Sequence, residues 1–580
     1  MDDTMLLEKR DDISVVLCGR AGQGIQSVEH LLTRICKRAG YNVFAAKEYM
    51  SRIRGGMNST QIRVSSEPVR ASVSRIDILI PLDKGAVRHV EKRITPQTII
   101  LAEQQVIGDD FDRAGHKFVD VAFTRTASEI GGKIYSNVVA VGTIAALFGI
   151  DLQTVSAYVA EFFCAKSDDV VQKNLVAVKK GFDIGLGLVN SGKIRVEIAG
   201  AADLESQILV NGAEAVALGA IAGGCDFISS YPMSPSTGVL AFLAGQAKDF
   251  GIIAEQAEDE IAAINMALGA WYAGARAMVT TSGGGFALMT EGLSLAGMLE
   301  SPIVIHLAQR PGPATGLPTR TEQADLELAL YGGHGEFPRI LLGPGRLEDA
   351  FHLTRKAFYL ADKYQVPVFI LTDQYFVDSY YNTGCFDLSD TRIDKHIVKT
   401  GVDYRRYELT ANGISPRGIP GFGQGLVAVD SDEHDEAGHI TEDLELRVAM
   451  VDKRLKKLEL LPNETTPPKL VGPEDYKNLV VCWGSTYHIV EEAVGKLEAD
   501  DVALLHFAQL YPLPSGTADY LLKARTTAIV ENNATSQFAK LIKLHTGIDI
   551  EEKILKYDGL SYAVEELVER LNESFSRGKA

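Results

Sequence analysis

The sequence is poor in cysteine, and its cysteines lie far apart. Six cysteines in 580 residues are spread from Cys18 to Cys482, and no C-x-x-C pair occurs. Iron–sulfur clusters and structural zinc ions usually need closely spaced thiolates, so the sequence encodes neither ligand set. It also lacks an uninterrupted apolar run near the roughly 20 residues that cross a bilayer. We therefore expect reduced structural thiols and no membrane span.

Acidic residues outnumber basic ones, 76 to 58. The formal net charge is −18, which argues against nucleic acid as the main partner, because domains that bind nucleic acid are basic. The first residues, MDDTMLLEKRDD, are acidic and unlike a secretory signal, so the expected location is the cytoplasm. With 46% hydrophobic and 23% charged residues, the composition is typical of a globular protein, and the length predicts several domains.

Strand-like and helix-like segments alternate along most of the chain. The short apolar runs at 13–19, 76–82 and 98–106 predict buried strands, and 136–150 predicts a buried helix. This alternation is typical of parallel sheets with helices on both faces, so we expect an α/β protein with three doubly wound parallel-sheet domains. The expected divisions are a tail at 1–12, a first domain at 13–190, a second at 191–385, a connecting region at 386–470 and a third domain at 471–580.

A glycine-rich turn, GRAGQG, joins the first predicted strand to the first helix. Gly19, Gly22 and Gly24 would let the backbone approach a phosphate at the helix N-terminus, although a tight turn without a ligand has the same composition. The spacing differs from the dinucleotide-binding G-x-G-x-x-G. The nearby segment SRIRGGMNSTQIR, either a loop for a phosphorylated ligand or a solvated basic loop, contributes Arg52, Arg54 and Arg63.

The segment SYPMSPST (230–237) follows a predicted strand. Pro232 and Pro235 stiffen the exit from the strand, and Ser236 or Thr237 can cap the next helix. Rigid hydroxyl groups at the carboxyl end of a strand lie where open α/β sheets bind ligands. A well-capped turn with no ligand is the alternative.

Acidic residues begin the next predicted helix, in EQAEDEIAAINMALGA (255–270). Glu258, Asp259 and Glu260 would complement the helix dipole at this position. They also lead directly into an apolar run. A carboxyl group at that edge would be partly desolvated and therefore able to hold a proton.

Three further segments carry candidate residues. TTSGGG (280–285) is another turn from a strand to a helix, with Gly283 and Gly284. Arg310 ends an apolar strand, where it is either a surface residue or a fork that binds a carboxylate through two hydrogen bonds. DSDEHDEAGHITED gathers carboxylates around His434 and His439, but the spacing fits no standard metal motif. A solvated linker is the favoured interpretation of that segment, and no metal ligand is assigned.

Together these segments resemble the 2-oxoacid:ferredoxin oxidoreductase family. Residues 13–190, with GRAGQG and the Arg-Gly-Gly loop, resemble its γ domain. Residues 196–580 resemble its α subunit, with SYPMSPST, the EDE helix, TTSGGG, RPGPATGLPTRTEQADL and GGHGE. A γ domain fused ahead of α is most similar to the 2-oxoglutarate enzymes of two kinds of subunit. The resemblance implies a γ domain, a thiamine-diphosphate (ThDP) pyrimidine-binding domain and a transketolase C-terminal-like domain.

The resemblance also implies roles for individual residues. Ser234 would lie beside the substrate, Glu260 would contact the aminopyrimidine of ThDP, and Arg310 would meet the 2-oxo carboxylate. Glu258 is the competing choice for the aminopyrimidine, because the motif is acidic at both positions. Further residues implied at the cofactor are Tyr231, Pro232, Ser236, Thr237, Gly283 and Gly284, and the γ-domain turn with Gly19, Gly22 and Gly24 is expected near coenzyme A.

Parts of the family's active site are missing from this sequence. The family holds the diphosphate and Mg²⁺ of ThDP with GDG and a later asparagine, and GDD at 108–110 is not that motif. The chain also has no cysteine set for a [4Fe-4S] cluster. Both parts belong to the β subunit in the family. The resemblance therefore implies half of a split active site, a β partner, an (αβ)₂ assembly and ferredoxin as the electron acceptor.

The implied reaction is reversible. It converts 2-oxoglutarate, coenzyme A and oxidised ferredoxin into succinyl-CoA, CO2 and reduced ferredoxin, and the reverse direction would fix CO2. The distal carboxylate of 2-oxoglutarate needs a cation or strong donors, for which Arg320 and His334 are candidates. Pyruvate, a branched 2-oxo acid and indolepyruvate stay open as substrates. A non-catalytic subunit that binds coenzyme A and a non-oxidative ThDP decarboxylase are the alternatives of other classes.

Overall fold

The computed structural model describes residues 5–6, 12–51, 56–108, 115–201, 204–389 and 393–577. Contacts divide the chain into two compact units. The first consists of Met1–Val210, Ser379–Cys385 and Ala563–Glu565, and the second consists of Asn211–Asp378, Phe386–Tyr562 and Glu566–Ala580. Within the described ranges, no helix is long and apolar enough to cross a membrane. The α/β class predicted from the sequence is confirmed, because helices and strands alternate in both units and most strand pairs of the described chain are parallel.

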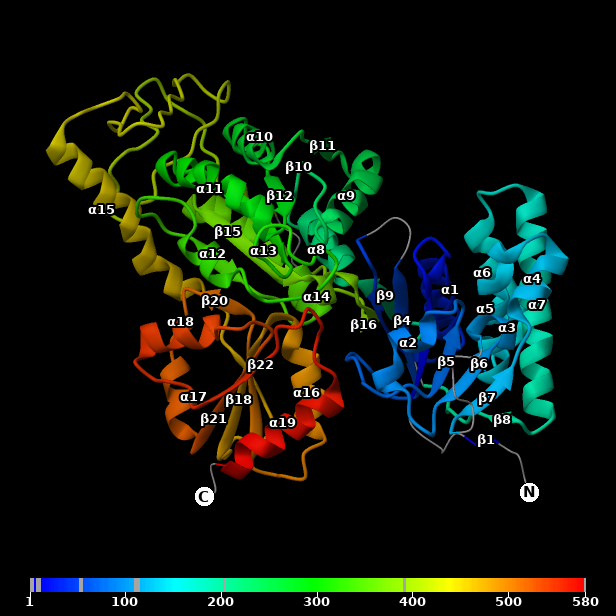
Figure 1. Ribbon diagram of the computed structural model, residues 1–580. Coiled ribbons are helices and arrows are strands. Elements are labelled where there is room, and N and C mark those ends of the chain that lie inside the picture. The colour runs from blue at the N-terminus through cyan, green and yellow to red at the C-terminus, as the bar shows by residue number, and fades with distance from the viewer. Residues whose placement is uncertain are drawn as a thin grey trace. The chain divides into compact units, whose positions relative to one another are not determined.

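An eight-stranded mixed sheet forms the first unit (Figure 1). Half of it is parallel, as predicted, since β2 pairs in parallel with β5. The other half is antiparallel, because β4 runs against both β2 and β3. The strand order is β7 (Lys117–Asp120), β6 (Ile99–Ala102), β5 (Ile78–Pro81), β2 (Asp12–Arg20), β4 (Met57–Ser65), β3 (Asn42–Glu48), β16 (Tyr380–Gly384) and β9 (Gln207–Asn211).

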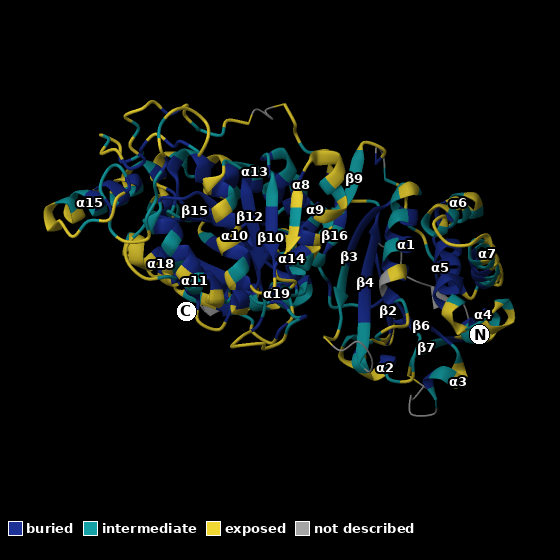
Figure 2. Cartoon of the chain, turned by 90° about the horizontal axis from the view of Figure 1, so that it is seen from above, coloured by how far each residue is buried: buried dark blue, intermediate teal, exposed yellow. Residues whose placement is uncertain are grey.

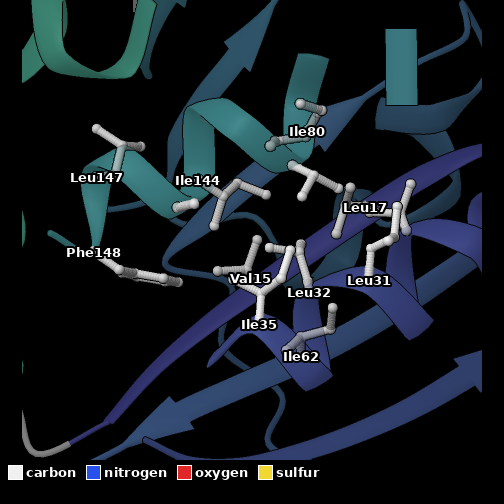
Figure 3. Packing of buried hydrophobic residues seen from close by; sticks show 14 of the residues in the cluster. Val15, Leu17, Leu31, Leu32, Ile35, Ile62, Ile80, Ile144, Leu147 and Phe148 are labelled. Atoms are coloured by element: carbon white, nitrogen blue, oxygen red, sulfur yellow. The ribbon is translucent and has the colours of Figure 1, made fainter. Parts of the chain in front are cut away.

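The core of this unit lies between the sheet and the helices α1 (Ile25–Arg38) and α5 (Ser136–Leu147). Figure 3 shows leucine and isoleucine side chains of both helices meeting those of β2, β4 and β5. Helix α5 is buried along its whole length, as predicted for 136–150. On its far side it packs against α7 (Asp168–Asn190), where a Cβ at Gly181 would collide with the backbone of Val139. Because the sheet covers one side of α5 and α7 covers the other, all faces of α5 are apolar.

Two predictions for the first unit are wrong. The strand expected over 98–106 ends at Ala102, and a short helix, α3 (Gln104–Ile107), follows it. The segment read as a basic loop contains β4, in which the Arg63 side chain is buried, pairs with Asp12 at 2.6 Å and donates to the Ala71 carbonyl at 2.7 Å. Arg63 is therefore structural and cannot bind a phosphorylated ligand. Arg52 and Arg54 lie outside the described residues.

The second unit contains a seven-stranded sheet whose central strands are buried along their length (Figure 2). Six strands are parallel, and β20 closes one edge in the antiparallel direction. The order is β11 (Ile253–Gln256), β10 (Phe227–Ser230), β12 (Ala277–Thr281), β13 (Ile303–Gln309), β15 (Pro367–Asp373), β14 (Ile340–Leu342) and β20 (Gln509–Tyr511). The helices that follow or join these strands are α8 (Gly212–Ala222), α9 (Thr237–Phe250), α10 (Glu260–Tyr272), α11 (Gly283–Met298), α12 (Leu326–Tyr331) and α13 (Leu347–Tyr364).

A five-stranded sheet completes the second unit, in the part of the chain predicted to be a third α/β region. Its first strand is antiparallel to its neighbour, and the other pairs are parallel. The order is β17 (Lys469–Val471), β19 (Val502–Phe507), β18 (Asn478–Trp483), β21 (Thr526–Glu531) and β22 (Glu552–Leu555). Helices α16 (Tyr487–Gly495), α18 (Gln537–Thr546) and α19 (Val564–Arg577) accompany it.

The segment at 386–470 is held on the seven-stranded sheet by buried ion pairs. Helix α15 (Leu444–Leu460) brings Lys453 and Lys457 to Glu300, with 2.7 Å between Lys457 Nζ and the carboxylate. All three side chains are almost completely buried. Burial alone would raise the pKa of Glu300, but Lys457, Lys453 and Arg406 outweigh it and hold that pKa well below the usual range.

The acidic segment at 430–443 is not the solvated linker that its composition favours. His434 is fully buried, with its ring centroid 3.8 Å from that of Tyr407. Glu433 forms ion pairs with Arg447 and Arg454. His439 is largely exposed, as a linker residue would be. No group of three or more possible metal-ligating side chains occurs in the described part of the chain.

Candidate functional site

The turns singled out in the sequence meet at one edge of the seven-stranded sheet. SYPMSPST follows β10, TTSGGG ends β12 and begins α11, and Arg310 follows β13. Strands β10, β12 and β13 are parallel neighbours, so their carboxyl ends lie at the same edge. This is the edge at which open α/β sheets bind ligands.

Glu260 begins helix α10 and points into this edge. Its neighbour Asp259 caps the helix by accepting a hydrogen bond from Ala262 N at 2.7 Å. Glu260 is only 3% exposed, and its Oε1 is buried with no hydrogen-bond partner in the described structure. The competing Glu258 is exposed. Of the two carboxyl groups, only that of Glu260 is desolvated.

The glycine turn that begins α11 leaves room for this carboxylate. A Cβ at Gly285 would lie 2.7 Å from Glu260 Oε1 and would collide with Thr281 Oγ1. A side chain at this position would therefore displace Glu260. Gly283 is buried and Gly284 is exposed.

Arg310 lies against the SYPMSPST segment. Its Nη1 donates to the Ser234 carbonyl oxygen at 2.7 Å, whereas its buried Nε has no partner among the described residues. Burial lowers the pKa of Arg310, and the Asp325 and Glu260 carboxyl groups oppose that shift. Arg310 is thus half-buried between two carboxyl groups rather than an ordinary surface arginine.

The hydroxyl groups of SYPMSPST are only partly placed as predicted. Ser236 occupies the N-cap position of α9, but its Oγ donates to the Met233 carbonyl oxygen at 2.8 Å and does not cap the helix. Tyr231 and Pro232 are exposed, and Thr237 is the first residue of α9. The expected side-chain cap is therefore wrong, because the Ser236 hydroxyl group closes the preceding turn instead.

Asp325 is a site residue that the sequence did not single out. A Cβ at Gly283 would collide with its carboxylate, which places that carboxylate directly over the first turn of α11. Burial raises the pKa of Asp325 to about 6, and Arg310 opposes the rise. Asp325 Oδ2 and the nearby Ser282 Oγ are buried without a partner in the described ranges. In the sequence, the two acidic residues of TEQADL, in the loop that follows Arg310, could have indicated this site residue.

The two candidates for a distal carboxylate lie in different places. Arg320 belongs to the loop after Arg310 and packs against Gly559, where an added Cβ would be 3.2 Å from Arg320 Cβ. His334 donates its backbone N–H to Ser294 Oγ at 2.8 Å and lines a cavity of about 510 Å³. Ser294 lies 11 residues along α11 from Gly283, or about 16 Å at 1.5 Å per residue. The structure therefore does not bring His334 to the edge that carries Arg310.

In the first unit, the GRAGQG turn is closed by its own side chains. Arg20 N donates to Gln23 Oε1 at 2.8 Å, and Asn137 Nδ2 donates to the Gln23 carbonyl oxygen. Gly24 has a φ of 79°, a conformation that favours glycine, and Gly22 is exposed. These contacts account for the turn, and a ligand at Gly19, Gly22 and Gly24 stays a prediction.

Two family models match the chain. A model of the thiamine-diphosphate-binding domain of pyruvate flavodoxin/ferredoxin oxidoreductase matches residues 218–453, which contain Ser234, Glu260 and Arg310. A model of pyruvate ferredoxin/flavodoxin oxidoreductase matches residues 14–184. Both models describe one class of oxidoreductase, and the first is a ThDP-binding domain that spans the segments of the site edge.

Relatives extend over almost the whole chain. The 2-oxoacid:ferredoxin oxidoreductase subunit alpha of Sulfolobus sp is 32% identical, and the alignment covers 98% of each chain. The 2-oxoglutarate synthase subunit KorA of Archaeoglobus fulgidus is 34% identical over 330 residues, which cover 56% of this chain and 88% of that protein. The solved 2-oxoglutarate:ferredoxin oxidoreductase from Magnetococcus marinus, with 2-oxoglutarate, coenzyme A and succinyl-CoA bound, has a TM-score of 0.88 at 32% identity and covers 98% of this chain and 100% of that chain. The chain belongs to the 2-oxoacid:ferredoxin oxidoreductase family, as an alpha subunit.

Proposed function

We propose that this alpha subunit carries the aminopyrimidine and substrate side of a split active site that oxidises 2-oxoglutarate with coenzyme A to succinyl-CoA and CO2. The observation that carries this proposal is the buried, unpartnered Oε1 of Glu260 beside Arg310, whose buried Nε is also unpartnered. Buried polar atoms without partners need an explanation, and at the edge where open α/β sheets bind ligands a bound ligand supplies one. The choice of 2-oxoglutarate is supported by the printed names of KorA and of the Magnetococcus enzyme.

Glu260 fits a bound ThDP. When bound, the cofactor would supply the stabilisation of negative charge at the carbon that loses CO2. Glu260 Oε1 would accept a hydrogen bond from a ring N–H of the aminopyrimidine, for which no donor of the described chain competes. Gly285 keeps that carboxylate in place by having no side chain. The exposed Glu258 is not needed for this role.

Arg310 would bind the 2-oxo carboxylate. Its hydrogen bond to the Ser234 carbonyl oxygen fixes the plane of the guanidinium group and leaves the buried Nε for the substrate. Because it is half-buried, a charge-assisted hydrogen bond from this group is stronger than one in water. Ser234 would then lie beside the reacting carbon. Arg320 follows in the same loop and is preferred to His334 for the distal carboxylate.

The other half of the active site would come from a β subunit. In the described residues no cluster could hold Mg²⁺, and the sequence contains neither GDG nor closely spaced cysteines. We assign the Mg-diphosphate site and the iron–sulfur cluster to the β partner in an (αβ)₂ assembly, with ferredoxin as electron acceptor. The γ domain at 13–190, with Gly19, Gly22 and Gly24, would contact coenzyme A.

The test is an anaerobic assay of the purified chain alone and with its β partner. Reduction of a one-electron acceptor is followed with coenzyme A and each of 2-oxoglutarate, pyruvate, a branched 2-oxo acid and indolepyruvate. Activity only in the pair, highest with 2-oxoglutarate, is the expected result. A preference for another acid would change the substrate and keep the split site. Activity of the lone chain, or none from an intact pair loaded with ThDP, would overturn the proposal.

A further inference from the structure

The Asp325 side chain does not make the hydrogen bond that an aspartate at a helix N-cap normally makes. It occupies the N-cap of α12, where an aspartate usually accepts from a backbone N–H of the first turn. Here no such bond forms, and the carboxylate lies over Gly283 instead. No hydrogen bond to this carboxylate occurs in the part of the chain that the structure describes, and its Oδ2 is buried.

The backbone of Asp325 is nevertheless held firmly. Its N–H donates to Gln309 Oε1 at 3.0 Å, and Gln309 Nε2 donates to the Thr372 carbonyl oxygen at 3.1 Å. Gln309 is the last residue of β13, directly before Arg310. The carboxylate is therefore fixed at the edge of the sheet, and its lack of partners is not the result of a loose loop.

The charged groups around Asp325 come from three elements. Arg310 at the end of β13 acts on it directly, and Glu260 at the start of α10 acts on Arg310. Glu322 is half-buried in the same loop, and the turn that begins α11 contributes Ser282 and glycines. Burial, Asp325 and Asp558 raise the pKa of Glu322 to about 7.

The reaction of the proposed function requires a proton acceptor. The bond between the 2-oxo carbon and the carboxylate breaks, and a bond from that carbon to the coenzyme A sulfur forms. CO2 leaves, two electrons pass to the acceptor, and the thiol proton is released. The buried Asp373 ends the neighbouring strand β15, but its carboxylate already accepts hydrogen bonds from Phe376 N and Ser485 Oγ. With Glu260 assigned to the aminopyrimidine and Arg310 to the substrate, Asp325 is the other carboxyl group of the site with a buried oxygen that has no partner among the described residues.

We infer that Asp325 is a further catalytic residue, which takes the thiol proton as the acyl group is transferred to coenzyme A and passes it to Glu322. This inference rests on the proposed function. Glu322 lies in the same loop, close enough for the charge of Asp325 to raise the pKa of Glu322, so a protonated Asp325 can pass its proton to it. Glu322 is only half-buried and can release the proton to water.

The experiment uses the αβ complex loaded with ThDP and the substitutions Asp325→Asn and Glu322→Gln. Asparagine keeps the shape of the side chain but cannot carry the proton. The matched control is Glu327→Gln, two residues further on in α12, where the carboxylate pairs with Lys540 at 3.0 Å. We expect Asp325→Asn to lower coenzyme A-dependent turnover about 100-fold and Glu322→Gln to lower it less. CO2 release in a single turnover without coenzyme A should stay at the wild-type rate, as should both rates in the control.

Two readouts separate this role from a structural one. At pH 8 the thermal midpoint of Asp325→Asn should be no lower than that of the wild type, because the wild type there carries an ionised carboxylate without a hydrogen-bond partner. In infrared spectra without substrates, the protonated-carboxyl absorption that appears as the pH falls through about 6 should be weaker in the variant, in which Asp373 still contributes to it. Unchanged turnover, an equal loss of both rates, or an undiminished band would overturn the inference. A wild-type complex with no coenzyme A-dependent oxidation would instead overturn the proposed function.

Discussion

Glu258 and Glu260 lie two residues apart but differ in burial. Glu258 is exposed before helix α10, whereas Glu260 is 3% exposed and has an unpartnered oxygen. Either residue fits the acidic motif, and the sequence alone left both open. The helix starts at Glu260, whose first-turn position faces the sheet edge, and this favours Glu260 for the proposed role.

This difference predicts opposite results for two conservative substitutions. Glu260→Gln should lower turnover by about 100-fold or more, because the amide cannot hold a protonated ring nitrogen as a carboxylate does. Assembly with the β partner should survive, since no hydrogen bond within the described chain is lost. Glu258→Gln is the control and should retain near-normal turnover. Steady-state kinetics and size-exclusion chromatography check both variants, and near-normal turnover of Glu260→Gln would remove its assigned role.

At the scale of elements, a buried glutamine helps to tie the loop after Arg310 to the five-stranded sheet. Gln323 is fully buried. It exchanges backbone and side-chain hydrogen bonds with Asn532 at 2.6 and 3.0 Å and donates its Nε2 to the Trp483 carbonyl oxygen at 2.9 Å. The loop therefore has a fixed position beside Asp325 and Arg310.

Gln323→Ala should loosen this loop without unfolding the sheet beneath it. We expect KM for the 2-oxo acid to rise roughly 10-fold or more, because Arg310 and Asp325 lose their fixed positions. The control is Gln365→Ala, which removes an equally buried side chain that bonds the Ser415 carbonyl oxygen at 2.6 Å, away from the site. Both variants should melt earlier, but only Gln323→Ala should change KM. Equal kinetics in the two variants would show that Gln323 serves stability alone.

Glu300 anchors the segment at 386–470 to the seven-stranded sheet, and this gives a prediction on stability. Glu300→Gln would leave the buried Lys453 and Lys457 without their anion and should lower the free energy of unfolding by about 3–5 kcal/mol. Because the pKa of Glu300 lies below its usual value, its stabilisation is complete above the ordinary carboxyl range and is lost as the pH falls below it. Urea denaturation from pH 2 to 8 should show this acid loss in the wild type, below the ordinary carboxyl range of about pH 4, and less of it in the variant. The exposed Glu336→Gln serves as the control, and equal curves would contradict the prediction.

The elements that sequence reasoning found are those whose pattern is local. The buried strands β2, β10, β12, β13 and β18 are short apolar runs ended by glycine or polar turns, so their type follows from composition. Strand β4 was missed because MNSTQIRVS is polar, and its pairing with β2 and β3 depends on residues far away in the sequence. Asp325 was missed for the same reason. Whether an aspartate caps its own helix or faces another one is decided by tertiary packing.

At the scale of the whole molecule, the site region presents apolar side chains that the described chain leaves exposed. Ile261 follows Glu260 in α10 and is 51% exposed, and Leu288, one turn along α11 from Gly284, is 52% exposed. Large exposed apolar side chains beside an incomplete site are typical of a surface that another subunit covers. The proposed β subunit supplies the missing half of this site, so we expect it to cover these residues.

Leu288→Asp should therefore prevent assembly with the β partner while the lone chain still folds. A buried, unpaired carboxylate at an interface is costly, whereas the same substitution on an exposed face changes stability by only about 0.5 kcal/mol. Leu444→Asp is the control, because Leu444 is 79% exposed at the start of α15, outside the three turns that form the site. Co-purification and light scattering should show loss of the complex for Leu288→Asp alone, with an unchanged melting midpoint of the lone chain in both variants. If Leu288→Asp still formed an active complex, the β subunit would have to approach the site from a direction other than α11.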